Sequence, residues 1–297
     1  MKLEFKVTDN KYFNIKDVLK NHFEISERLL AKLKRNQKIY LNNTPAYVNS
    51  KIKIGDLIIV DLDFEEETEN IVPSKMELEI LYEDDSFLII NKSFGIAVHP
   101  SILHFEDSLS NGVKYYFNEI NLNKKIRPVN RLDKDTSGIV IFAKNEYIQE
   151  SLIKQMKNKD FSKEYLAILE GNFENSSGTI NAPISRKEGS IIEREINPNG
   201  EIAITHYELV KNFAKNNQEL SLVKFLLETG RTHQIRLHSK HLNHPILGDS
   251  LYGNSSNLIS RQALHAFKIR FIHPISKKEI IIEIDLPEDM KSILNDI

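Results

Sequence analysis

The order of apolar and polar residues predicts many short strands with a few helices between them. The apolar runs 139–143 and 165–169 have the length of buried strands, and the first is rich in β-branched residues. Helices are expected at 145–158 and 233–243, and strands and helices do not alternate strictly. This order predicts an α+β fold with a largely antiparallel sheet, not a doubly wound parallel one.

The first sixty residues predict a small module with a basic helix. Ser26 is placed to cap a helix whose leucines share one face. The opposite face carries three cations at positions i, i+4 and i+7, namely Arg28, Lys32 and Arg35. Extended segments around the turn Gly55-Asp56 follow. A basic helix face of this kind is typical either of a nucleic-acid-binding module or of an ordinary solvated surface.

Charge is segregated along the chain, although the net charge is only −2. Residues 1–60 carry 12 Lys and Arg against 6 Asp and Glu, whereas residues 61–85 carry 1 against 11. This asymmetry indicates a basic nucleic-acid-binding module followed by an acidic spacer, whose like charges at 65–70 would repel and keep it extended. We therefore expect an RNA-binding domain at 1–62, a linker at 63–75 and a catalytic domain at 76–297.

Composition narrows the class of protein. The chain has 297 residues, of which 40% are hydrophobic and 28% are charged. It has no cysteine, so disulfides, thiolate nucleophiles and Cys-based zinc sites are excluded, and a reducing compartment fits. The first twenty residues lack the apolar core of a signal peptide, and no apolar run approaches the ~20 residues of a membrane helix. We expect a cytoplasmic protein without a membrane partner.

The loop 131–138, with the sequence RLDKDTSG, is the most informative segment of the chain. It places Asp133 between basic residues, in small turn-forming residues, directly before the buried run 139–143. Catalytic groups are often found on loops that a rigid scaffold positions. Asp133 is therefore a candidate catalytic residue, and the alternative is a loop aspartate that caps a turn or pairs with Arg131.

This loop is one of a series of short motifs that occur in the same order in one enzyme family. The motifs lie at 91–95, 98–100, 131–138, 163–165, 182–184, 203–207, 229–238, 244–249 and 264–266. On these motifs the chain resembles the pseudouridine synthases of the RluA/RluD type over roughly residues 78 to 285. Asn130 stands where the family usually has His, and Ser93 where it usually has Pro. Because an amide still donates and accepts hydrogen bonds, we expect altered loop contacts at Asn130 and not lost chemistry. The basic helix and small sheet of residues 1–62 resemble the S4 RNA-binding module, with a looser match.

The resemblance implies an RNA uridine isomerase that works without a cofactor. It places Asp133 as the nucleophile and Arg236 against it, where a guanidinium can hold both carboxylate oxygens. Tyr165 is expected to stack on the target base, with a hydroxyl that can help to remove the C5 proton. The three catalytic candidates span more than a hundred residues and are expected to converge in a central cleft.

The same resemblance implies contacts with RNA. We expect the enzyme to be a monomer with RNA as its only partner. The target uridine must leave its stack, and Arg131 is placed to enter the vacated position. The other expected RNA contacts are Lys163, Arg231, His233, Arg28, Lys32 and Arg35, mainly to phosphates. An S4 module joined to such a catalytic domain favours large-subunit (23S-type) ribosomal RNA, and tRNA is the alternative substrate.

Two other classes of function remain as alternatives. The chain could be a non-catalytic RNA-binding or ribosome-assembly factor built on the synthase fold, for which Asn130 is the main argument. It could instead be a metal-dependent hydrolase that uses its clustered histidines, His233, His238, His241 and His244. No carboxylate stands at a recognisable metal-motif spacing and HExxH is absent, so no metal site is expected.

Overall fold

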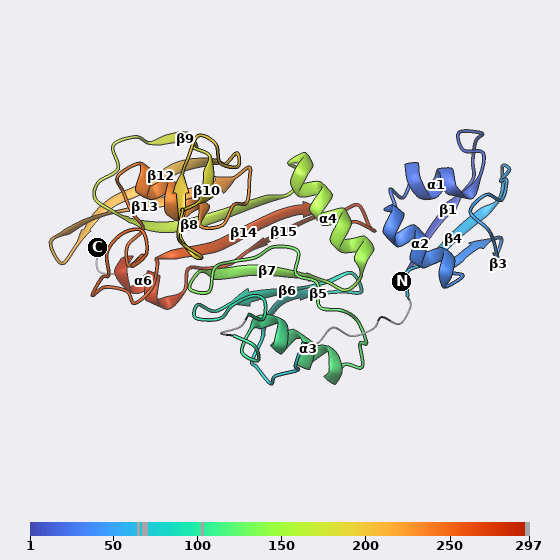
Figure 1. Cartoon of the computed structure of the whole chain (residues 1–297), viewed down its shortest axis with the longest axis horizontal. Helices are drawn as coiled ribbons and strands as arrows, with labels where there is room; N and C mark the ends of the chain where they lie inside the picture. The colour runs from blue at the N-terminus through green and yellow to red at the C-terminus, as the bar shows by residue number, and fades with distance from the viewer. Residues whose placement is uncertain (64–65, 67–70, 102–103, 295–297) are drawn as a thin grey trace.

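The chain folds around two main sheets of unequal size, which Figure 1 shows at opposite ends of the molecule. The structure is a computed structural model that describes residues 1–63, 66, 71–101 and 104–294. The smaller sheet belongs to the N-terminal unit and the larger to the rest of the chain. This arrangement is the predicted α+β fold, because nearly all strand pairs of both sheets are antiparallel.

The N-terminal unit packs two helices against a four-stranded sheet in the order β1-β4-β2-β3. Its helix α2 begins after Ser26, whose hydroxyl accepts a hydrogen bond from the Leu29 amide at 3.1 Å, so the predicted cap is confirmed. Its elements are β1 (Lys2–Lys6), α1 (Ile15–Asn21), α2 (Glu27–Arg35), β2 (Ile39–Leu41), β3 (Thr44–Pro45) and β4 (Leu57–Asp61).

The larger sheet runs in the order β5-β6-β7-β14-β8-β13-β12-β9, and β15 pairs with β14 at its side. Only β7 and β14 pair in parallel among the described strands. The strands are β5 (Glu79–Glu83), β6 (Phe87–Lys92), β7 (Ser137–Ala143), β8 (Ser162–Glu170), β9 (Ser177–Asn181), β12 (Ile204–Lys215), β13 (Gln218–Leu227), β14 (Leu264–Ile272) and β15 (Glu279–Glu283). A separate hairpin joins β10 (Ile184–Arg186) to β11 (Arg194–Ile196).

Strand β7 is buried on both faces, which explains its uninterrupted apolar sequence. Val140 and Phe142 join a core with α3 (Leu109–Glu119), whereas Ile139 and Ile141 join one with α4 (Glu146–Asn158). The remaining helices are α5 (Gln234–His241) and α6 (Glu288–Leu294). The structure therefore confirms both helices predicted in this region, with α5 ending two residues before the predicted boundary.

Gly138 allows the loop that precedes β7 to approach β14 closely. Its φ is +119°, and a Cβ atom there would lie 2.3 Å from the carbonyl oxygen of Ala266. Any larger residue would force β7 away from β14 at the point where the two strands pair. The position of the aspartate loop therefore depends on this glycine.

The basic face of α2 lies against α4 of the larger unit and not entirely against solvent. Glu146, at the start of α4, forms ion pairs with Lys32 and with Arg28, the latter at 3.0 Å. Ser26 donates a hydrogen bond to Glu150 at 2.8 Å, one turn further along α4. Figure 1 shows the N-terminal unit beside this helix. Two of the three predicted RNA-binding cations thus have carboxylate partners within the protein.

The acidic segment between the two units also contacts the larger one. Glu66 is buried and forms a two-oxygen ion pair with Arg127, with distances of 2.6 and 2.7 Å. Asp63 accepts a hydrogen bond from Lys124 at 2.7 Å. The expectation of a self-repelling, extended linker is therefore wrong at Glu66, because a buried arginine neutralises its charge. Residues 64–65 and 67–70 lie outside the described part of the chain.

Within the described residues, no helix is both long and apolar enough to cross a membrane.

Candidate active site

Asp133 lies on the loop that leads into β7, at the edge of a cavity of about 920 Å³. The Thr136 amide donates to the Asp133 carbonyl at 3.1 Å and closes a turn directly before the strand. The Asp133 side chain is 27% exposed, so it is accessible to a molecule in the cavity. The structure thus places the candidate nucleophile on a rigid loop beside open space.

Asn130 fixes the loop to β7 through both ends of its amide. Its Nδ2 donates to the Ile139 carbonyl and its Oδ1 accepts from the Ile141 amide, both at 2.9 Å. The side chain is buried, so neither hydrogen bond competes with water. The departure from the family's usual histidine therefore leaves the loop anchored.

Two buried cations, Lys92 and Arg261, donate hydrogen bonds to the backbone of the same loop. The Lys92 ammonium donates to the carbonyls of Ser93, Ile96 and Lys134 at 2.8 to 2.9 Å. Burial lowers the pKa of Lys92 to about 7, while the three acceptors favour the ammonium, because a neutral amine has only two N–H groups. Arg261 donates to the Asp135 carbonyl at 3.2 Å. Neither residue was assigned a role from the sequence.

Arg236 contacts Asp133 from helix α5, as the resemblance implies. Its Nη1 donates to Asp133 Oδ2 at 3.1 Å. The expected two-oxygen pair goes instead to Asp249, whose oxygens accept from Nε and Nη2 at 2.7 and 2.8 Å. Burial opposes the charge of Arg236, but Asp249 and Asp133 more than offset it and raise the pKa of Arg236. Asp249 therefore orients the guanidinium, and Asp133 receives one hydrogen bond.

Tyr252 and His233 complete the surroundings of Arg236. The guanidinium carbon lies 5.1 Å from the centre of the Tyr252 ring, in cation–π geometry. His233 caps α5 in a left-handed conformation, its Nδ1 lies 2.8 Å from the Tyr252 hydroxyl, and its Nε2 lies 3.8 Å from Asp133 Oδ2. Burial, and after it the charge of Arg236, lowers the pKa of His233 below its ordinary value, although Asp133 acts in the opposite direction. His233 thus lies between Asp133 and Tyr252 and contacts both.

Tyr165 and Lys163 project from β8 on the same face, because they are two residues apart on a strand. Both line the cavity that contains Asp133. Burial, with a smaller contribution from the charge of Asp133, raises the pKa of Tyr165, so its hydroxyl stays protonated at neutral pH. Burial lowers the pKa of Lys163. The cavity wall opposite the aspartate loop thus offers an aromatic ring and an amine.

The cavity brings together most of the residues that the sequence singled out. Asp133, Tyr165, Lys163, Arg131 and Arg231 all line it. Arg236 and His233 lie behind Asp133 and contact it directly, as described above. The helix α2 cations, Arg28, Lys32 and Arg35, do not line it. A cleft with a carboxylate, an aromatic ring and several cations suits a nucleobase with its phosphates.

Asp249 and Tyr252 are candidate site residues that sequence reasoning missed. Asp249 closes the motif 244–249, but nothing in the sequence pairs it with Arg236, thirteen residues earlier. The sequence could have suggested a second carboxylate near Arg236, because an arginine in a closed site needs more than one hydrogen-bond acceptor. Only the fold shows that Asp249 supplies the acceptor.

Three of the four clustered histidines, His233 among them, have hydrogen-bonding partners within the protein. His238 contacts Thr205 Oγ1 and the Ala182 carbonyl at 2.8 and 3.0 Å, and His244 contacts the Glu170 carbonyl at 2.8 Å. Among the residues that the structure describes, no group of three or more histidine or carboxylate side chains is placed to hold a metal ion. The arrangement gives the hydrolase interpretation no support.

Comparison with known proteins agrees with this site. Residues 86–241 match the family model described as RNA pseudouridylate synthase. The chain is 41% identical to YhcT of Bacillus subtilis, called an uncharacterized RNA pseudouridine synthase, over 93% of this chain and 90% of the relative. It is 35% identical to ribosomal large subunit pseudouridine synthase D of Yersinia pestis, over 82% of this chain and 78% of the relative.

A solved structure is similar to this chain in fold and, more distantly, in sequence. Human RNA pseudouridylate synthase domain containing 1 superposes with a TM-score of 0.59 at 26% identity, over 70% of this chain and 83% of the human one. The family match begins at residue 86, so it does not reach the N-terminal unit. On these matches and the geometry of the cleft, the chain belongs to the RNA pseudouridylate synthase family and is a pseudouridine synthase of the RluA type.

Proposed function

We propose that this enzyme isomerises specific uridines to pseudouridine in large-subunit ribosomal RNA, with Asp133 as the nucleophile and without a cofactor. The observation that carries the proposal is the contact of Arg236 with Asp133 at the wall of a cleft lined by Tyr165. The substrate class is supported by the 35% identical relative of Yersinia pestis, whose name states that substrate.

The surroundings of Asp133 suit a carboxylate that attacks carbon. Arg236 places a positive charge 3.1 Å from one of its oxygens. The contacts of Arg236 and His233 with the carboxylate are both with Oδ2. Oδ1 therefore remains available for a bond to the nucleotide, while Oδ2 stays oriented. In the reaction the ribose leaves N1 and joins C5, C5 loses its proton and N1 gains one.

Tyr165 supports the base and supplies a protonated hydroxyl. Because burial and the negative charge of Asp133 raise its pKa, the phenol is a poor proton acceptor while Asp133 is ionised. When Asp133 forms a covalent bond it loses that charge, and one of the two causes of the raised pKa disappears. The protonated phenol can take the C5 proton only as it passes its own proton to the base, where N1 must gain one, and this exchange is easier after the bond to Asp133 has formed.

Arg131 and Lys163 are placed for the RNA chain around the extruded nucleotide. Both line the cleft, and Arg131 is exposed and adjacent in sequence to the aspartate loop's buried Leu132. A flipped base leaves a gap in its stack, which a long cationic side chain can fill. Lys163 lies deeper in the cleft, where its amine can contact a phosphate of the extruded nucleotide.

The N-terminal unit is proposed to be an S4-like RNA-binding domain of residues 1–62, joined by residues 63–75 to a catalytic domain of residues 76–297. Because Arg28 and Lys32 pair with Glu146, the exposed Arg35 is the cation of this face best placed to meet a phosphate. The protein would act as a monomer in the cytoplasm, with RNA as its partner.

Turnover and binding, measured separately, test the proposal. Asp133→Asn should form no pseudouridine in a bacterial large-subunit ribosomal RNA transcript and should bind that transcript as wild type does, because Asn has the same shape. Asp285→Asn is the matched control, since this exposed residue lies outside the cleft. Product formation by Asp133→Asn would refute the nucleophile. Conversion of a tRNA transcript alone would replace the ribosomal substrate with tRNA.

A further inference from the structure

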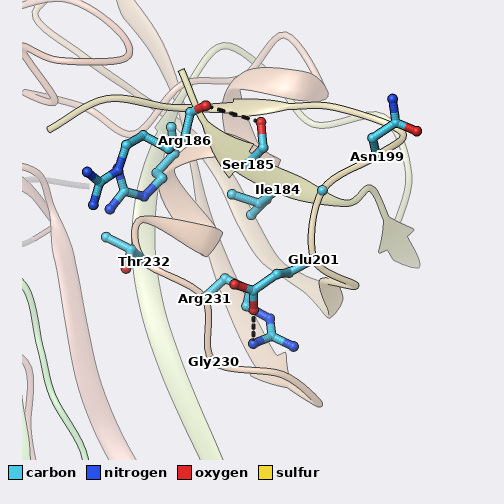
Figure 2. A pocket seen from close by; sticks show the side chains of 10 residues that line it. Ile184, Ser185, Arg186, Asn199, Glu201, Gly230, Arg231 and Thr232 are labelled. Carbon is cyan, nitrogen blue, oxygen red and sulfur yellow. Dashed lines mark hydrogen bonds and ion pairs between the residues drawn. The ribbon is translucent and has the colours of Figure 1, made fainter. Parts of the chain in front are cut away.

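A second cavity, of about 490 Å³, opens beside the catalytic cleft (Figure 2). It is lined by the β10–β11 hairpin, the loop after it and residues 230–232. Its polar lining residues include Arg186, Arg194, Arg231, Ser185, Asn199 and Glu201. Of these polar residues, only Arg231 also lines the catalytic cleft and was expected to contact RNA.

The cavity shares a wall with the cleft. Gly230, Arg231 and Thr232 line both spaces. A Cβ atom on Gly230 would lie 3.3 Å from the Lys163 amine, which faces the cleft from β8. A chain that occupies the cleft can therefore continue over residues 230–232 into the second cavity.

The hairpin that forms the outer wall is held rigidly. Ile184 and Glu201 exchange two backbone hydrogen bonds at 2.8 and 2.9 Å. Gly200 approaches the hairpin so closely that a Cβ atom there would lie 2.5 Å from the Ile184 carbonyl carbon. The Arg194 amide donates to the Tyr252 hydroxyl at 2.8 Å. Since Tyr252 also packs on Arg236, the cavity has a fixed position relative to Asp133.

Its charge suits an anion. Three guanidinium groups line the cavity, and Glu201 is the one acidic residue among the lining residues. Arg231 forms an ion pair with Glu201 and donates to the Ile202 carbonyl, as Figure 2 shows for the ion pair. The Arg186 guanidinium forms no hydrogen bond or ion pair with the described residues, and Arg186 is exposed. Planar guanidinium groups match the geometry of phosphate oxygens.

We propose that this cavity is a second nucleotide subsite, which binds a phosphate of the RNA strand next to the target nucleotide. Arg186 and Arg231 contact the phosphate, and Glu201 releases Arg231 when the phosphate arrives. This inference rests on the proposed RNA substrate, and it adds the path that the strand takes from the cleft. The continuous wall from Lys163 to Arg231 favours an RNA strand over a separate anionic ligand.

The first test is the salt dependence of binding to a bacterial large-subunit ribosomal RNA transcript. Arg186→Ala should raise Kd roughly fivefold. It should also make the slope of log Kd against log salt smaller by about 0.7 to 0.9, the value for one phosphate contact. KM should rise with kcat unchanged, because Arg186 touches no reacting atom. Arg270→Ala, an exposed arginine that lines neither cavity, should match wild type. A Kd and slope equal to wild type for Arg186→Ala would overturn the proposal.

Glu201→Gln gives the second test, with an effect of opposite sign. Removal of the competing carboxylate should lower Kd for the same transcript, roughly twofold to fivefold. Weaker binding would show that Glu201 itself contacts RNA and would overturn the exchange. If wild type forms pseudouridine but neither Arg186→Ala nor Glu201→Gln changes Kd, only the second subsite is refuted. Absence of pseudouridine formation by wild type on both ribosomal RNA and tRNA would instead defeat the proposed function.

A third test locates the contact on the RNA. Short synthetic RNAs that span one modified uridine each carry a single uncharged methylphosphonate linkage at a different position. One linkage near the uridine should weaken binding to wild type and weaken binding to Arg186→Ala by a smaller factor, because one of the two arginine contacts with that phosphate is already lost. Equal losses in both proteins at every position would contradict the subsite.

Discussion

The most demanding prediction concerns Asp249, which contacts no substrate but orients Arg236. Asp249→Asn keeps the shape of the side chain and changes one acceptor oxygen into an N–H donor. Asp249 Oδ1 accepts from Arg236 Nη2 and from the amides of Leu251 and Tyr252, and Oδ2 accepts from Arg236 Nε at 2.7 Å. Asn retains the first three of these hydrogen bonds. The Asn side-chain NH2 group would then face the N–H group of Arg236 Nε, donor against donor, and the negative charge would be lost.

The expected loss of stability follows from burial. Asp249 is 1% exposed and Arg236 is 7% exposed, so the guanidinium cannot turn to water to replace the lost charge and the lost Nε hydrogen bond. Breaking a buried pair costs about 3 to 5 kcal/mol, and the retained hydrogen bonds place this variant near the lower end. A loss of about 3 kcal/mol corresponds to a fall of roughly 6 to 12 °C in Tm for a domain of this size. Calorimetry or thermal circular dichroism measures it directly.

The expected loss of activity follows from geometry. Without Asp249, Arg236 can turn towards Asp133 and take both of its oxygens, which would draw Oδ1 away from the nucleotide. A displacement of about 1 Å costs about 100-fold in rate, so kcat should fall by that factor while KM stays close to wild type. The assay is pseudouridine formation in the large-subunit ribosomal RNA transcript, below the Tm of the variant. A kcat within a few-fold of wild type would refute the positioning role, and Asp285→Asn controls for the loss of a carboxylate.

Three further predictions concern other residues. Burial, followed by the charge of Arg261, lowers the pKa of His265 to about 4, so only the unfolded state gains its proton as pH falls from 6.5 to 4. The contribution of neutral His265 to the free energy of unfolding is therefore complete above pH 6.5, and about 3 kcal/mol of it is lost towards pH 4. In urea unfolding between pH 7 and pH 4, His265→Gln should lose less stability than wild type as the pH falls. An equal loss in both proteins would contradict this. Tyr165→Phe should retain Tm and RNA binding but lose kcat, whereas full turnover would limit Tyr165 to stacking. Arg131→Ala should impair turnover on folded RNA more than on an unstructured oligomer, and equal losses would exclude a role in base flipping.

Local patterns were sufficient for the parts of the fold that depend on neighbouring residues. The loop before a buried strand at Asp133, the Ser26 cap and the helix at 145–158 were predictable from apolar periodicity and turn-forming residues. The convergence of Asp133, Tyr165 and Arg236 was predictable only from the resemblance to a family, because the three come from a loop, a strand and a helix.

Long-range ion pairs were not predictable, because charge along a sequence does not identify its partner. The cations of α2 had the pattern of a solvated or RNA-binding face, yet Lys32 and Arg28 pair with Glu146 more than a hundred residues away. Glu66 had the pattern of an extended acidic linker, yet it is buried against Arg127. In each case the partner lies on an element that only the tertiary fold brings close.

The most direct test of the central claim is pseudouridine mapping of total RNA from cells that lack this protein, rescued with wild type or with Asp133→Asn. We expect that specific sites in large-subunit ribosomal RNA lose pseudouridine in these cells and that only wild type restores them. Sites restored equally well by Asp133→Asn, or no change at any site, would contradict it.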